Sequence, residues 1–179
     1  MKVFSVLGSP RRKGNTSVVL ERFLQGIREN HVGVEECVVF LHEKSIKPCM
    51  ACDSCKTGTK TCVVDDDMQR LYGEVKKADL IVFATPIYWW NMSSQLKTFL
   101  DRLYALDYEN DFRNKRFVLL MTYGGEDPNS GALLLEKSLR EVCEFLAMDF
   151  AGSFGLCSEN PSEQNDKLIE EAYKLGKKL

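Results

Sequence analysis

The sequence lacks the features that would commit it to a membrane, to secretion or to nucleic acid. It carries 24 Lys and Arg residues against 26 Asp and Glu residues, so its formal net charge of -2 does not attract a polyanion. The five apolar or small residues before Gly8 are too few for a signal-peptide core, and no stretch approaches the ~20 apolar residues that span a bilayer. We therefore expect a cytoplasmic protein that binds neither nucleic acid nor a membrane.

Histidine is scarce in the sequence, whereas cysteine is not. His31 follows a predicted helix and His42 lies in a predicted loop, and neither belongs to a motif that would make it a catalytic base. The seven cysteines do not indicate a disulfide framework, because the cytosol keeps thiols reduced. They indicate thiol, metal or redox chemistry, so their spacing becomes informative.

Strands and helices are predicted to alternate along the chain. Apolar runs rich in β-branched residues predict strands at 3–7, 34–40, 80–85, 117–122 and 150–156. Helical periodicity predicts helices at 16–29, 68–77, 94–104, 133–147 and 164–179. Near-continuous apolar strands linked by helices are typical of a buried parallel sheet. We predict an α/β three-layer sandwich, with a five-stranded parallel sheet in the flavodoxin-like order 2-1-3-4-5 and helices on both faces.

The chain is expected to form a single domain over residues 1–179. Its length and its 44% of hydrophobic residues suffice for one full core, and no repeat or linker divides it. Residues 41–67 form the one long irregular insertion, and ordered loops of that length are usually functional. Ligands of doubly wound sheets bind beyond the carboxyl ends of the strands, so segments 8–16, 85–94 and 122–131 should converge.

The first of these segments, "GSPRRKGNT", is typical of an anion-binding turn at the start of a helix. Backbone N–H groups at a helix N-terminus favour a phosphate, and the cations at 11–13 can neutralise it. The pattern is neither the dinucleotide fingerprint nor a nucleoside-triphosphate loop, which favours a monophosphate. The alternative is that Asn15 or Thr16 only caps the helix and the cations are solvated.

The second and third segments suit a flat ring. In "ATPIYWWNMSS", Pro86 is expected to end the strand. The large side chains that follow can pack against a flat aromatic ring, and Asn91 and Ser93 can form hydrogen bonds at its edge. In "MTYGGEDPNSG", the two glycines at 124–125 allow close backbone approach. The alternatives are aromatics packed under a helix or at a subunit contact, and an ordinary glycine-rich turn.

Taken together, these three segments resemble the flavin-binding loops of the NAD(P)H-dependent FMN reductase branch of flavodoxin-like proteins, over nearly the whole chain. The resemblance implies that the FMN phosphate is bound by Ser9, Arg11, Asn15 and Thr16. It implies that the isoalloxazine is bound by Pro86, Ile87, Tyr88, Trp89, Asn91, Tyr123, Gly124 and Gly125. It also implies a homodimer or homotetramer whose flavin site borders a subunit contact.

Four cysteines stand close together in the insertion, in "CMACDSCKTGTKTC": Cys49, Cys52, Cys55 and Cys62. The first three have the spacing of a ferredoxin cluster motif, but six residues separate the fourth, and Val63 rather than proline follows it. The run resembles the compact motif of iron-sulfur flavoproteins, which implies a [4Fe-4S] cluster held by these four residues. An empty or oxidised loop, a zinc site and packed free thiols are the alternatives. The other cysteines, Cys37, Cys143 and Cys157, are expected in the core.

After the cysteines, "DDDMQRL" predicts a helix start capped by Asp65 or Asp66, with a metal or acid–base role as the alternative. The leading functional hypothesis is an FMN-dependent oxidoreductase that takes electrons from NAD(P)H and passes them to a quinone or other small acceptor, with no catalytic acid, base or nucleophile from the protein. The second is an iron-sulfur flavoprotein that exchanges electrons with ferredoxin, and the third is a flavin-loaded binding protein.

Overall fold

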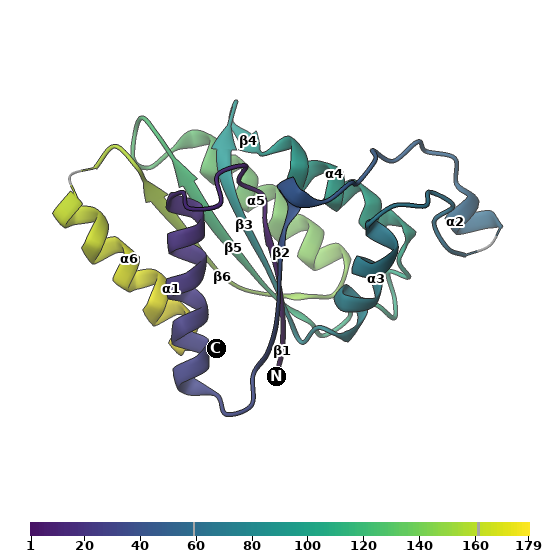
Figure 1. Ribbon diagram of the computed structural model, residues 1–179, viewed down its shortest axis with the longest axis horizontal. Helices are drawn as coiled ribbons and strands as arrows, with labels where there is room; N and C mark the ends of the chain where they lie inside the picture. The colour runs from purple at the N-terminus through teal and green to yellow at the C-terminus, as the bar shows by residue number, and fades with distance from the viewer. Residues whose placement is uncertain (59, 161) are drawn as a thin grey trace.

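A twisted parallel sheet runs through the middle of the molecule, with helices on both sides (Figure 1). The computed structural model describes residues 1–58, 60–160 and 162–179. The parallel strands follow the order β2 (Glu35–Phe40), β1 (Lys2–Leu7), β3 (Leu80–Tyr88), β5 (Arg116–Tyr123) and β6 (Asp149–Cys157). A two-residue strand, β4 (Asn91–Met92), pairs antiparallel with the end of β3 and shifts the later labels by one. The predicted fold class and strand order 2-1-3-4-5 are therefore confirmed.

The helices divide between the two faces of the sheet. Helices α1 (Asn15–Asn30) and α6 (Ser162–Lys177) pack together on one face, at the left of Figure 1. The other face is covered by α3 (Met68–Lys77), α4 (Ser94–Arg102) and α5 (Ser130–Phe145). Within the described parts of the chain, none of the helices has the length and apolar character that crossing a membrane requires.

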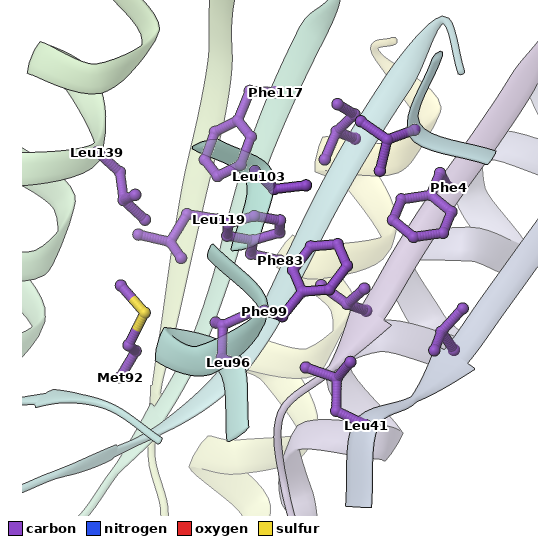
Figure 2. Packing of buried hydrophobic residues seen from close by; sticks show 14 of the residues in the cluster. Phe4, Leu41, Phe83, Met92, Leu96, Phe99, Leu103, Phe117, Leu119 and Leu139 are labelled. Carbon is purple, nitrogen blue, oxygen red and sulfur yellow. The ribbon is translucent and has the colours of Figure 1, made fainter. Parts of the chain in front are cut away.

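Each central strand contributes to two cores, because successive side chains point to opposite faces. In β3, Ile81 and Phe83 belong to the core under α3, α4 and α5, whereas Val82 belongs to the core under α1 and α6. Figure 2 shows the larger core, in which the Phe83 ring meets the rings of Phe99 and Phe117 edge-on at centroid distances of 6.0 and 5.0 Å. The sheet is thus buried on both sides and supports the loops at its ends rigidly.

Element boundaries differ from prediction where polar side chains cap the backbone. Helix α5 begins at Ser130 rather than 133, because the Asn129 side chain accepts the N–H of Ala132 at 3.1 Å. Helix α4 ends at Arg102, and a 3₁₀ turn, η2 (Leu103–Ala105), completes the stretch predicted as helix 94–104. A second 3₁₀ turn, η1 (Leu41–Glu43), and a short helix, α2 (Ser54–Thr57), lie in the insertion and were not predicted.

The prediction that Pro86 ends its strand is wrong. Strand β3 continues to Tyr88, and Pro86 keeps its register with Thr122 of β5. The pairing of β1 with β3 ends earlier, at Leu7 with Ala84. From Thr85 onward that side of β3 is an edge, where a residue without an N–H group breaks no ladder. The longer strand then carries the chain directly into the hairpin with β4.

Candidate functional site

The loops that follow β1, β3 and β5 converge on a cleft of about 180 Å³ at the carboxyl ends of the strands. The cleft is lined by Ser9, Arg11, Gly14, Asn15, Thr16, Pro86, Ile87, Tyr88, Thr122, Tyr123, Gly124 and Ser158. Nine of the residues predicted for a flavin site are therefore brought together here. The other three, Trp89, Asn91 and Gly125, do not line it. Prediction missed Gly14, Thr122 and Ser158, of which Ser158 follows the fifth parallel strand and so lay within reach of the same strand-end rule.

One end of the cleft has the chemistry of an anion site. Helix α1 starts there with no acidic residue in its first turn and no side-chain cap. In the described chain, the backbone N–H groups of Asn15 and Thr16 have no hydrogen-bond partner. Buried Ser9 accepts the N–H of Arg11 at 3.1 Å, which folds the loop back over the helix start. Free N–H groups at the positive end of a helix, beside a cation, fit a phosphate.

The cations at 11–13 do not all serve this end of the cleft. Arg11 lines it, whereas the guanidinium of Arg12 pairs with Glu43 and lies 5.5 Å from the centroid of the Phe40 ring. Inside the cleft, the hydroxyls of Thr16 and Thr122 are hydrogen-bonded at 2.7 Å, which ties the start of α1 to the end of β5. The loop therefore offers one arginine to an anion and uses the next one to hold its own shape.

The aromatic run forms the mouth of the cleft. Ile87 and Tyr88 line it, but the next two residues make the two-residue turn between β3 and β4, with φ of 47° at Trp89 and 61° at Trp90. Such a turn needs positive φ at both positions, a conformation that strains large side chains. Trp89 is left 90% exposed and does not line the cleft. Its predicted contact with a flavin ring therefore stays a prediction.

The turn is fixed against the start of α5. The Trp90 indole N–H donates to the Ser130 hydroxyl at 2.9 Å. A Cβ atom on Gly131 would lie 2.6 Å from the Cα of Trp90, so only glycine permits this approach. Asn91, at the base of the turn, accepts the N–H of its neighbour Met92 at 2.8 Å and stays outside the cleft. The strained turn is therefore held by contacts and is not a free loop.

The opposite wall of the cleft is formed by the end of β5. Tyr123 donates its hydroxyl to the carboxylate of Asp127 at 3.0 Å. Burial, reinforced by that carboxylate, raises the pKa of Tyr123, so the phenol stays protonated and keeps its one O–H bonded to Asp127. Gly124 lines the cleft, whereas Gly125, with φ of 81°, turns the chain away from it. This wall combines a fixed aromatic ring with exposed backbone.

The four cysteines of the insertion line one small cavity, which shares no residue with the cleft. Cys49 and Cys52 are exposed, and Cys55 and Cys62 are half-buried. Left-handed backbone at Ala51 (φ 50°) and Asp53 (φ 54°) bends the loop between them. Their donor set fits an iron-sulfur cluster, but in the described part of the chain no three side chains of His, Cys, Asp or Glu lie close enough together to hold a metal ion. Figure 1 shows this segment, with α2, at the far side of the molecule from α1 and α6.

A buried ion pair closes the base of the cysteine segment. Arg102, at the end of α4, binds Asp66 through both terminal nitrogens, at 2.6 and 3.2 Å, and the two side chains are 1% and 2% exposed. Burial alone would raise the pKa of Asp66, but hydrogen bonds from Arg102 and from backbone amides hold that pKa below its usual range. The prediction that Asp65 or Asp66 caps the helix is wrong, because the cap position of α3 is Asp67, although Asp66 does accept the N–H of Met68 at 3.0 Å.

A larger groove of about 520 Å³ adjoins the cavity of the cysteine loop, since Cys49 lines both, and is walled by the aromatic rings of Tyr104, Tyr108, Phe112 and Phe145. It is mostly apolar and offers few groups that would orient a ligand, so its size does not make it the active site. The remaining cysteines contribute to packing. Cys143 and Cys157 are buried and Cys37 is half-buried, and burial raises the pKa of the Cys143 thiol to about 12.

The sheet and the cleft at the ends of its strands define a flavodoxin-like α/β protein. The model of a family described as NADPH-dependent FMN reductase matches residues 1–160, and the chain belongs to that family of flavin-dependent NAD(P)H oxidoreductases. An iron-sulfur flavoprotein of Methanocaldococcus jannaschii is 36% identical, with all of this chain and 95% of the relative covered. One of Archaeoglobus fulgidus is 30% identical, with all of this chain and 79% of the relative covered. Among solved structures, an NAD(P)H:quinone oxidoreductase from Methanothermobacter marburgensis has the same fold, with a TM-score of 0.76, 19% identity and coverage of 99% and 94%.

Proposed function

We propose that the cleft binds FMN and that the protein takes electrons from NAD(P)H and passes them to a quinone or another small acceptor. The observation that carries the proposal is the convergence of an uncapped helix start, one arginine and an aromatic loop at the carboxyl ends of β1, β3 and β5. Membership of the FMN reductase family supports it. The free thiols also favour a cytoplasmic location, and we propose that residues 1–179 act as a single domain.

The residues of the cleft divide into two groups by chemistry. Ser9, Arg11, Asn15 and Thr16 would bind the phosphate, and Pro86, Ile87, Tyr88, Tyr123 and Gly124 would hold the ring. When bound, FMN supplies hydride acceptance and one- or two-electron release, so no acid, base or nucleophile of the chain is required. A cleft of about 180 Å³ is smaller than typical enclosed pockets, so a flavin would stay open at the mouth to varied acceptors.

The residues outside the cleft are assigned to its mouth. Trp89, Asn91 and Gly125 lie on the two turns that flank the opening. We propose that they meet the outer edge of the ring or a second subunit, in a homodimer or homotetramer whose flavin site borders the contact. An exposed tryptophan at the mouth suits such a contact, because large aromatic side chains are enriched in interfaces.

A matched pair of arginine variants tests the FMN proposal. Arg11→Gln removes the charge that lines the cleft, and Arg12→Gln removes the neighbouring charge that pairs with Glu43 outside it. We expect Arg11→Gln to weaken FMN binding about 10- to 100-fold, since a charged hydrogen bond contributes roughly 1.5–3 kcal/mol. Arg12→Gln should bind FMN nearly as the wild type does, and equal losses in both variants would contradict the assignment. Stopped-flow reduction by NADH and by NADPH then identifies the donor.

The cysteine segment favours a second candidate, an iron-sulfur flavoprotein that exchanges single electrons with ferredoxin. The supporting observation is that Cys49, Cys52, Cys55 and Cys62 all line one cavity. When bound there, a [4Fe-4S] cluster would supply one-electron transfer. Iron and acid-labile sulfide, assayed on anaerobically purified protein, decide the matter: about four irons per chain support the cluster. Zinc, or thiols that all react with an alkylating reagent, would exclude it.

The electron source separates the two candidates further. Rapid bleaching of the flavin by NADPH but not by reduced ferredoxin would exclude the carrier function. Bleaching by ferredoxin with slow or no reaction with NADPH would exclude the reductase as the main activity. Sustained NAD(P)H oxidation with a quinone would exclude a binding protein without turnover.

A further inference from the structure

Arg102 connects both ends of the cysteine segment to the body of the protein. One terminal nitrogen donates to the carbonyl of Lys47, two residues before Cys49, at 2.8 Å. The other donates to the sulfur of Cys62 at 3.3 Å. The Tyr72 hydroxyl donates to the carbonyl of Arg102 at 3.0 Å and fixes the backbone at the end of α4. A single guanidinium thus contacts the segment both where it leaves the core and at its last cysteine.

Anchoring the loop does not by itself require a buried ion pair between Arg102 and Asp66. Removing two charges from water is costly, and apolar side chains of the same size often serve stability as well. Both carboxylate oxygens of Asp66 accept two hydrogen bonds each, because the N–H groups of Lys47 and Met68 also donate to them, at 2.9 and 3.0 Å. Arg102 still has an unused donor, because its buried Nε–H has no partner in the part of the chain that the structure describes. The guanidinium keeps donor capacity beside the cavity that the four cysteines line.

We infer that Arg102 is a positioning residue of the iron-sulfur site: it holds Cys62 as the fourth ligand and raises the reduction potential of the cluster. This inference rests on the proposed cluster. A hydrogen bond from a cation to a ligand sulfur favours the more negative, reduced state, and hydrogen bonds to sulfur are among the factors that set such potentials. Asp66 acts through Arg102, because its carboxylate orients the guanidinium of Arg102 and balances the positive charge.

The test compares Arg102→Gln/Asp66→Asn, which keeps a pair of similar size without charge, with the wild type. The control is Arg140→Gln, which removes an exposed arginine that pairs with Glu136 on α5. Iron, sulfide and FMN are counted per chain, and the midpoint potential of the cluster is measured by titration followed by electron paramagnetic resonance. We expect the double variant to bind FMN normally, to hold less iron and to show a cluster at least tenfold harder to reduce, about 59 mV for one electron.

Each outcome decides one proposal. Wild-type protein without iron and sulfide refutes the cluster, and the role of Arg102 with it. Iron in the wild type, with an unchanged potential in the double variant, refutes the role of Arg102 alone, since a purely structural tie lowers iron content without moving the potential of the clusters that remain. Should the double variant lose FMN, Arg102→Lys decides instead. Lysine keeps the charge but presents one nitrogen in place of the fork, so we expect a smaller negative shift, and an unshifted potential overturns the role.

Discussion

The strand-end cleft and the cysteine segment solve the same problem, bringing distant residues together, in different ways. The cleft takes its residues from the ends of strands that two cores hold in register, so the sheet itself places them. The cysteine segment is an insertion without a strand, attached at its base by the Arg102–Asp66 pair. Topology preorganises the first site, whereas the second is held by side-chain contacts, among them those of Arg102 at its base and the bond from Lys56 to the carbonyl of Leu106 at 2.9 Å. Substitutions in the two sites should therefore affect stability and ligand binding differently.

The largest expected effect breaks the anchor of the cysteine segment. Arg102→Gln leaves the carboxylate of Asp66 buried without its partner, which should lower the free energy of unfolding by about 3–5 kcal/mol. Arg102→Gln/Asp66→Asn should recover most of that loss, because no buried charge remains. Urea unfolding of the three proteins measures both changes. A single variant as stable as the wild type would show that the pair does not anchor the segment.

The next largest effect is expected from displacing the backbone of the turn between β3 and β4, at the mouth of the cleft. Gly131→Ala places a Cβ atom 2.6 Å from the Cα of Trp90, so the turn between β3 and β4 must shift, at a cost of about 1–3 kcal/mol. FMN affinity should fall with it. Gly73→Ala in α3 is the control, since its Cβ would meet nothing within 4 Å, and it should stabilise the protein by about 0.5–1 kcal/mol. Thermal unfolding and FMN titration compare them, and a harmless Gly131→Ala would mean that the turn is not held there.

A smaller effect relieves the strain at the mouth of the cleft. Trp89→Asn together with Trp90→Gly supplies the residues that a turn with two positive φ values prefers. We expect about 1 kcal/mol of added stability, or roughly 2–4 °C in melting temperature for a chain of this size. The cysteine segment should not respond, so its iron content is the internal control. Loss of stability would indicate that indole contacts outweigh the strain.

The smallest effect is confined to acid. Because the folded pKa of Asp66 is lowered, its contribution to stability is fully present above the unfolded pKa of about 3.9 and is lost as the pH falls through the folded value. Unfolding followed at pH 7 and at stepwise lower pH should show this loss in the wild type. Arg102→Gln/Asp66→Asn should show a flatter pH dependence, and identical profiles would exclude Asp66 as the group responsible.

The comparison also explains what the sequence could predict. The strand-end rule found Ser9, Arg11 and Tyr123, because loop position alone brings such residues to the cleft. Trp89 was predicted on the ring by its place in the aromatic run, but whether it lines the cleft depends on the φ values of a two-residue turn, which do not follow from composition. Only three-dimensional pairing reveals Arg102, since in the sequence it is one more cation on an amphipathic helix.

The turn at Trp89 and Trp90 has an optical consequence. The chain contains two tryptophans, and both stand in this one turn. Their fluorescence therefore comes from a single corner of the molecule, and flavin absorption overlaps indole emission, so a flavin arriving in the cleft should quench nearly all of it. The two tryptophans thus act as an intrinsic fluorescent probe of the mouth of the cleft, and the cysteine segment contributes no tryptophan to this signal.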